Sequence, residues 1–265
     1  MKMMALSVLQ TGLGLFSGSL VGFSLGLVGG GGSILAVPLM VYLVGVADPH
    51  VALGTSAIAV AANAAVNLAN HARAGNVKWR CAAVFATAGI AGAYGGSSLG
   101  KMVDGQKLLI LFALLMLVIG ALMLRKRSGE GDLTVELHRG NFPALFALGF
   151  AVGAISGFFG IGGGFLIVPA LMLATGMPIL SAVGSSLVAV TAFGLTTAAN
   201  YASSGYVDWS LAAVFVAGGV LGGLLGARSA KTLSGKRGAL NTVFAALIFA
   251  VAIYMLSRSL MQIWS

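Results

Sequence analysis

The fold of this chain is decided by Gly26-Leu-Val-Gly-Gly-Gly-Gly-Ser-Ile-Leu-Ala-Val-Pro-Leu39, which returns later as Gly157-Phe-Phe-Gly-Ile-Gly-Gly-Gly-Phe-Leu-Ile-Val-Pro-Ala170. Seven of the fourteen positions match at a fixed offset of 131 residues. After a one-residue deletion the match resumes at offset 130, where Asn70–Trp79 pairs with Asn200–Trp209. Apolar character alone would not bring glycine, proline, asparagine and tryptophan into register. The sequence therefore predicts two homologous halves.

The composition around this repeat is that of a membrane protein. Hydrophobic residues make up 58% of the 265 residues, and charged residues only 8%. A soluble domain needs far more charge on its surface. Apolar stretches close to 20 residues recur, and each is long enough to cross a hydrocarbon core. Together with 40 glycines, which suit closely packed helices in lipid, this predicts an all-α polytopic membrane protein.

Each half is expected to contain about five helical segments. The halves are 1–124 and 141–265, joined by a linker at 125–140. In the first half we place the segments at 7–28, 33–46, 51–72, 79–99 and 106–124. In the second half we place them at 142–159, 164–176, 179–202, 209–229 and 238–262. The second segment of each half reaches only about 20 Å, less than a bilayer core, so we expect it to be a short or re-entrant helix.

The basic residues indicate how the halves are oriented. A net charge of +9 in a soluble protein would suggest nucleic acid. Here the Lys and Arg residues lie in short clusters between apolar segments, so no nucleic-acid partner is expected. If each half crosses the membrane an odd number of times, the Lys and Arg residues divide 11 to 4 between the two sides. Four crossings per half would divide them only 9 to 6. The positive-inside rule favours the odd number, and hence two inverted-topology repeats in a cell inner membrane with the linker 125–140 in the cytoplasm.

The glycine stretches are candidates for an anion site. Four nearly consecutive glycines destabilise a helix by roughly 1 kcal/mol each, and in lipid such a break persists only inside protein or beside a wet cavity. A new helix then begins, and its free N–H groups and dipole favour an anion. Inverted repeats would bring the two breaks together near the midplane. Close packing of helices on glycine faces is the alternative. A dinucleotide site would need a βαβ context, which is absent from the pattern.

Polar residues on the third segments extend this candidate site. Asn63, Asn67 and Asn70 share one helix face, which we expect to meet the protein interior or a cavity. Hydrogen bonding between helices is the alternative, and it is the favoured interpretation for the Ser and Thr residues. The predicted substrate-binding residues are Gly29, Gly30, Gly31, Gly32, Ser33, Pro38, Ser56, Asn63, Asn67, Gly160, Gly162, Gly163, Gly164, Pro169, Ser186 and Thr197.

The sequence contains no set of residues typical of an enzyme active site. All acidic residues fall in predicted loops or at segment ends, so no carboxylate relay of the kind found in many proton pumps is expected within the membrane. The serines lack an intramembrane His/Asp pair, and no metal-ligand spacing occurs. We therefore expect no catalytic activity, no metal and no cofactor.

At these motifs the chain resembles the sulfite exporter TauE/SafE family of membrane permeases. The resemblance spans nearly the full length. It rests on Gly29 to Pro38 and Gly160 to Pro169, on the following Gly-Thr-Ser and Gly-Ser-Ser (Gly54–Ser56 and Gly184–Ser186), and on the Gly-x-Val-x-Trp loops. It implies about eight spans, which agrees with our segments if the short ones are re-entrant. It also implies transport of sulfite, sulfonates or related sulfur anions.

Four functional classes are weighed on this basis. The leading expectation is a secondary transporter that exports small sulfur-containing anions by alternating access of the halves. An anion channel on the same scaffold is the first alternative, because embedded acids are lacking. A membrane scaffold without transport is the second, and the duplicated glycine breaks count against it. An intramembrane enzyme ranks last.

Overall fold

The computed structural model describes residues 7–124, 137–162, 164–232 and 237–264, and all regular structure within these ranges is helical. The first half contains α1 (Val8–Val28), η1 (Gly29–Leu35), α2 (Ala36–Pro38), η2 (Leu39–Leu43), α3 (Pro49–Arg73), α4 (Trp79–Met102) and α5 (Gly105–Leu124). The second half contains α6 (Phe142–Phe158), α7 (Gly164–Thr175), α8 (Ile179–Ala202), α9 (Trp209–Thr232) and α10 (Arg237–Trp264). Side chains at 27–31, 122–124, 227–228, 230–232, 237–244, 260 and 262–264 lie outside this description.

Nine of the ten expected segments are confirmed as α-helices, with ends that differ by no more than three residues. The exception is 33–46, where one new helix was expected after the glycines. Instead η1 is a 3-10 helix and η2 is a π-helix, with only three α-helical residues between them. The linker at 125–140 lies outside the described residues up to position 136.

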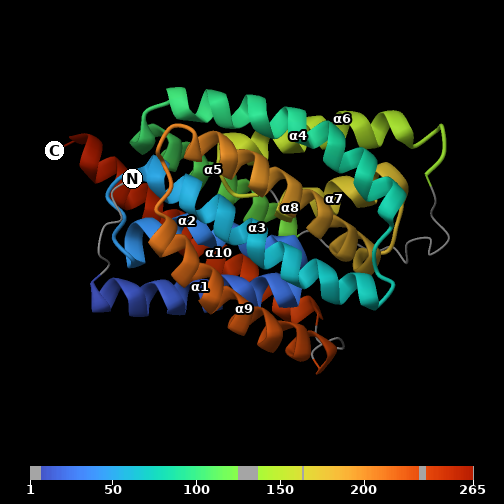
Figure 1. Ribbon diagram of the computed structural model, residues 1–265, viewed down its shortest axis with the longest axis horizontal. Helices are drawn as coiled ribbons and strands as arrows, with labels where there is room; N and C mark the ends of the chain where they lie inside the picture. The colour runs from blue at the N-terminus through green and yellow to red at the C-terminus, as the bar shows by residue number, and fades with distance from the viewer. Residues whose placement is uncertain (1–6, 125–136, 163, 233–236, 265) are drawn as a thin grey trace.

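Two glycine-lined helix pairs join the halves. α1 packs along α9, and α4 packs along α6 (Figure 1). A Cβ added at Gly22 would collide with the backbone of Gly219. Likewise, a Cβ at Gly153 would collide with the backbone of Gly89. By the repeat offsets, Gly22 is equivalent to Gly153 and Gly89 to Gly219, so the two pairs are copies of one contact. Small residues let the backbones approach this closely, as in membrane helix pairs.

Two hydrogen bonds between the halves are also copies of one contact. The backbone N–H of Lys78 donates to Ser185 Oγ at 2.8 Å. The backbone N–H of Asp208 donates to Thr55 Oγ1 at 3.0 Å. These donors and acceptors occupy equivalent positions at offset 130. The internal repeat of the sequence is therefore also a repeat of contacts in three dimensions.

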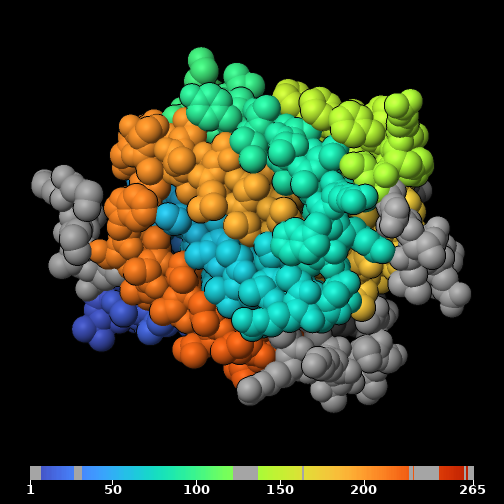
Figure 2. Space-filling model, turned by 45° about the vertical axis from the view of Figure 1, so that its right-hand side comes forward, coloured from blue at the N-terminus to red at the C-terminus, as the bar shows by residue number. Residues whose placement is uncertain are grey.

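α3 and α8 cross at the centre in opposite directions. A Cβ at Gly54, near the start of α3, would meet Tyr201 near the end of α8. A Cβ at Gly194, in the middle of α8, would meet Ala57 and Ala61 of α3. These are the two most enclosed of the helices long and apolar enough to cross a membrane. In Figure 2, part of α3 (cyan) lies between the orange helices α8 and α9 and the teal-to-green α4.

Equivalent helices of the two halves run in opposite directions. Gly18 faces Phe215, and Gly22, one turn later, faces Gly219, so α1 and α9 are parallel. Asn63 also faces Gly219, and α3 is parallel to both. α4, α6 and α8 run the other way. Each of the pairs α1 and α6, α3 and α8, and α4 and α9 is thus reversed within the molecule, as Figure 1 shows for α3 and α8.

The outer surface is apolar, and the charges lie at two ends. By length and composition, four helices could cross a membrane, within α1, α3, α8 and α9, and five shorter apolar helices lie among the described residues. Many large side chains on the outer helix faces are exposed, including Phe16, Leu221 and Leu225. Exposed apolar area of this extent suits a lipid environment. What we call the basic end holds Arg73, Lys78, Arg80 and Arg139. The opposite, mixed-charge end holds Asp48, Lys101, Asp104, Lys107, Asp208 and Arg258.

Candidate functional site

The glycine break of the second half lies at the crossing of α3 and α8. Gly160 and Gly162 both adopt a left-handed backbone with φ of +64°, which side-chain-bearing residues rarely adopt. They flank Ile161, which is fully buried. A Cβ at Gly162 would meet Val60 of α3 at 3.2 Å and Val190 of α8 at 3.3 Å. The turn of one half therefore rests on the central helix of each half.

Ser56 ties this turn to the first half. Its Oγ donates to Leu53 O at 3.0 Å and lies 3.5 Å from Gly160 O. Ser56 is fully buried. The chain then enters α7 at Gly164, which is also buried, so the predicted helix start after the glycines is present in this half.

The first half turns differently. η1 folds back on α1, since a Cβ at Gly32 would meet Ser24 and Leu25. η1 also contacts α7 and α8, and Ser33 and Pro38 are buried. Both breaks therefore contact α8. The expectation of a new α-helix with free N–H groups is wrong for this half, because the 3-10 and π-helical turns follow α1 without a regular helix start.

Asn63 carries the clearest unmet hydrogen-bonding capacity. Its Nδ2 and Oδ1 are both buried, and neither has a hydrogen-bond partner in the part of the chain that the structure describes. The amide lies against Gly219 of α9. Asn67 Nδ2 donates to Asn63 O at 2.9 Å, and its amide lies against Gly223. We call this contact of Asn63 and Asn67 with Gly219 and Gly223 the amide seam.

The equivalent place in the other half is apolar. Position 193, the counterpart of Asn63, is a phenylalanine whose ring packs on Gly89 and stacks on Phe85 at 6.2 Å. Both halves thus pack this side chain against an equivalent glycine, but the side chain is a polar amide in one half and an apolar ring in the other. A buried amide without partners costs about 1–3 kcal/mol per group, whereas Phe193 carries no such cost. Polar groups left unsatisfied in this way are concentrated at functional sites.

The remaining predicted residues differ in their surroundings. Thr197, the counterpart of Asn67, is fully buried, and its Oγ1 has no partner among the described residues. Ser186 Oγ donates to Val183 O at 2.8 Å, which fits the structural interpretation. Pro169 lies inside α7 and is half-buried. Gly163 lies outside the described residues, and so do the surroundings of Gly29, Gly30 and Gly31.

A lysine cluster lies outside the residues predicted from the sequence. Lys101 Nζ donates to Asn200 O at 2.9 Å, to Asn200 Oδ1 at 2.8 Å and to Ser204 Oγ at 2.8 Å. The amide of Asn200 in turn donates to Ser97 and Ser98. The repeat pairs Lys101 with Lys231 and Asn200 with Asn70, which is the signal that could have revealed the cluster. It satisfies carbonyl and hydroxyl oxygens near the end of α8.

Within the described ranges, no three His, Cys, Asp or Glu side chains gather in a way that could hold a metal ion. The polar groups at the centre are amides, hydroxyls and backbone, all neutral. Such a set can donate and accept hydrogen bonds to a ligand without trapping it by charge.

Known proteins resemble this chain over most of its length. The family model described as "Sulfite exporter TauE/SafE" matches residues 14–255. A "Probable membrane transporter protein" of Xylella fastidiosa (strain 9a5c) is 54% identical over 246 residues, which cover 92% of this chain and 94% of the relative. The "Probable membrane transporter protein YunE" of Bacillus subtilis (strain 168) is 29% identical over 236 residues, 81% of this chain and 85% of the relative. No solved structure gives a significant match.

An apolar helical protein with a repeated core, a buried polar seam and these relatives is a polytopic membrane transporter. More specifically, the chain belongs to the sulfite exporter TauE/SafE family.

Proposed function

We propose that this protein exports small sulfur-containing anions, such as sulfite or organosulfonates, across a cell inner membrane by alternating access of its two halves. The observation that supports this proposal most directly is the buried amide of Asn63 on the amide seam, which has no described hydrogen-bond partner. It lies on α3, next to the crossing on which the glycine break of the second half rests. A transported ligand that binds there would satisfy an amide that the described protein leaves unsatisfied.

The amide of Asn63 suits a protonated oxyanion. Nδ2 donates hydrogen bonds and Oδ1 accepts them. Hydrogensulfite offers both, because its unprotonated oxygens accept and its proton can be donated. A neutral amide binds such an anion less tightly than a lysine would, which allows release on the far side. For sulfite, we therefore propose the singly protonated form as the species bound.

The reversal of equivalent helices supports inverted repeats in the membrane. Inverted repeats typically place the substrate near the midplane, between halves that rock around it. The basic end would face the cytoplasm, together with the linker 125–140, since the described charges there are all positive. The mixed-charge end, which holds the start of α1 and the end of α10 (Figure 1), would face outward. Nothing in this arrangement calls for catalysis.

Flux in proteoliposomes tests the proposal. Vesicles containing the purified protein are loaded in turn with sulfite, thiosulfate, sulfoacetate, taurine, sulfate or chloride, with and without a pH gradient. We expect saturable efflux of sulfite or a sulfonate and little movement of chloride. Flux per total sulfite should rise as the pH falls, because hydrogensulfite is the bound form. Flux that never saturates would instead indicate a channel, and no flux of any anion from folded protein would contradict the proposal.

A further inference from the structure

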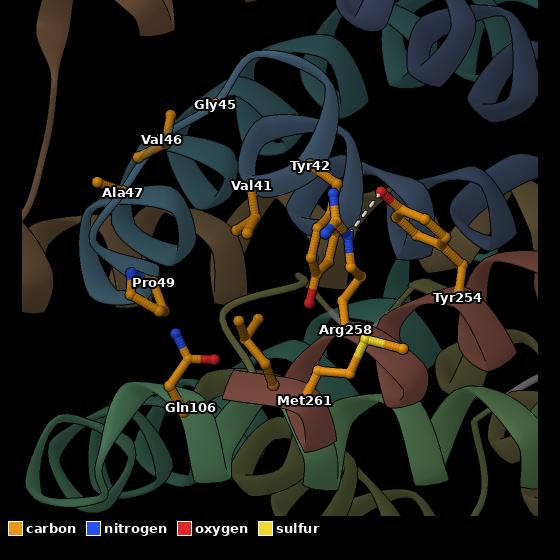
Figure 3. Close-up of a pocket in the computed structure, with 11 residues that line it drawn as sticks. Val41, Tyr42, Gly45, Val46, Ala47, Pro49, Gln106, Tyr254, Arg258 and Met261 are labelled. Atoms are coloured by element: carbon orange, nitrogen blue, oxygen red, sulfur yellow. Dashed lines mark hydrogen bonds between the residues drawn. The ribbon is translucent and has the colours of Figure 1, made fainter. Parts of the chain in front are cut away.

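A pocket of about 470 Å³ lies at the mixed-charge end, away from the central crossing. Its walls come from four parts of the chain: η2, the segment 45–49, the start of α5 and the last turns of α10 (Figure 3). Its volume is in the range of small-molecule sites. None of the residues predicted from the sequence to bind substrate lines it.

Among the described residues of the lining, Arg258 is the one cation. Arg258 Nε donates to Tyr254 OH at 3.3 Å, which leaves its other guanidinium N–H groups available. No carboxylate pairs with Arg258 among the residues that the structure describes. Asp48 and Asp104, the acidic residues nearest in sequence to the lining, instead accept hydrogen bonds from the backbone at the starts of α3 and α5. The guanidinium is thus an unneutralised donor group in a concave site.

Arg258 is an exposed side chain that lies beside two tyrosines. Tyr42 OH is hydrogen-bonded to Ser259 Oγ at 3.1 Å, and the Tyr42 and Tyr254 rings meet edge to face at 5.4 Å. Figure 3 shows Arg258 between these two tyrosines, with Gln106 on the other side of the pocket. Gln106 Oε1 is buried and has no described partner. The pocket therefore offers polar groups on both sides.

The other described side chains of the lining are apolar. Val41, Val46, Leu109 and Met261 contribute hydrocarbon surface beside the guanidinium. A bare inorganic anion would leave that surface wet, whereas an organic anion would cover it.

We infer that this pocket binds an amphipathic oxyanion, with a sulfonate, carboxylate or phosphodiester group on Arg258 and a short hydrocarbon chain on Val41, Leu109 and Met261. Such a group can come from a soluble organic anion or from the headgroup of an anionic lipid. Arginine binds planar or tetrahedral oxyanions through several N–H groups at once. The site is distinct from the amide seam and does not depend on the transport proposal.

The test is calorimetric binding to the full chain in phosphatidylcholine nanodiscs. The probes are methanesulfonate, propanesulfonate, pentanesulfonate and the neutral alcohol 1-pentanol. Affinity should rise about fourfold per added methylene group, and 1-pentanol should bind far more weakly than pentanesulfonate. Arg258→Gln should weaken pentanesulfonate binding by about tenfold or more. Arg139→Gln, an exposed arginine at the opposite end, serves as the matched control and should leave affinity unchanged.

Two further arms separate the possible outcomes. Asn63→Leu should keep the pentanesulfonate binding that Arg258→Gln removes, whereas a sulfonate bound at the amide seam would be lost in Asn63→Leu, so the two sites can be told apart. In phosphatidylglycerol nanodiscs, weaker pentanesulfonate binding would identify the lipid headgroup as the natural source, and unchanged binding would identify a soluble anion. Equal affinity of Arg258→Gln and wild type, no dependence on chain length, or no binding in either lipid would overturn the inference.

Discussion

At the scale of single residues, two asparagines on the central helices have opposite surroundings. Asn200 is held by Lys101 and donates to Ser97 and Ser98. Asn63 is as buried as any core side chain, yet both atoms of its amide lack a described partner. Hydrogen bonding accounts for the first residue, while we propose that the second binds the transported ligand.

Replacing Asn63 should separate function from stability. In Asn63→Leu, a similar volume is kept and an unsatisfied amide is removed, so the free energy of unfolding should stay level or rise by about 1–3 kcal/mol. Sulfite flux in proteoliposomes should fall to background. Thermal unfolding in detergent measures the first effect. Wild-type flux in this variant would remove Asn63 from the proposed site.

Asn200→Leu is the contrasting change. It leaves the ammonium of Lys101 and two serine hydroxyls short of partners, and we expect it to destabilise the protein by about 1–3 kcal/mol. The measurement is again thermal unfolding, compared directly with Asn63→Leu. If the two variants had the same stability, hydrogen-bond satisfaction would not be what distinguishes these asparagines.

The sequence could predict that Asn63 and Asn67 share one face, because that follows from helical spacing alone. It could not predict that this face meets Gly219 and Gly223 of the other half, since contacts between distant segments depend on how whole helices pack. The repeat does pair Asn63 with Phe193, and that mismatch between equivalent positions is a sign of asymmetry within the sequence itself.

At the scale of helices, the glycines have two separate roles. Those of α1, α4, α6 and α9 allow backbone contact along two equivalent helix pairs. Those at 160 and 162 shape a turn. Four consecutive glycines, Gly29–Gly32, leave the first half free to tighten into 3-10 turns, whereas Ile161 restricts the left-handed residues to its two neighbours. The sequence showed both breaks, but their different geometry depends on packing around that isoleucine.

Equivalent glycine substitutions in the two helix pairs should lower the free energy of unfolding by similar amounts. Gly22→Val and Gly153→Val each drive a side chain into a partner backbone, and each should destabilise the protein by about 1–3 kcal/mol or prevent folding. Gly12→Ala is the control, because nothing lies within 4 Å of its added Cβ. Unfolding in detergent compares all three. A large cost at only one of the two valine positions would contradict the equivalence of the pairs.

The turn at the crossing predicts a loss of transport. Gly162→Leu places a side chain on a left-handed residue that faces Val60 and Val190, so the turn must distort where the halves meet. We expect the protein to insert and sulfite flux to be abolished, and the same for Gly31→Leu. Membrane fractionation and proteoliposome flux are the measurements. Normal flux in both variants would exclude the glycine breaks from the transport site.

At the scale of the whole molecule, contacts that the first half makes with the second are repeated by the equivalent residues of the second half with the first. Lys78 and Asp208 donate to equivalent hydroxyls, and Trp79 and Trp209 begin helices of opposite direction. The sequence predicted the duplication and the division of charge. The packing of the first segment of each half on the fourth segment of the other half was not predictable. Glycine spacing indicates which face of a helix packs closely, but not which helix packs against it.

Opposite exposure of equivalent loops follows from this arrangement. In a Cys81→Ala background, Ala74→Cys and Ser204→Cys place single thiols at equivalent, exposed positions after α3 and α8. An impermeant maleimide added to intact cells should label position 204 and reach position 74 only after permeabilisation. Labelling of both from the same side would rule out inverted repeats.

Counterflow of sulfite tests the central claim most directly. Proteoliposomes loaded with unlabelled sulfite are diluted into a trace of radiolabelled sulfite, and uptake of label is followed over time. A carrier that exchanges one bound anion for another gives a transient accumulation of label above equilibrium. We predict that overshoot for the wild-type protein and its absence for Asn63→Leu. Label that enters without an overshoot in the wild type, or an undiminished overshoot in Asn63→Leu, would contradict alternating access through the amide seam.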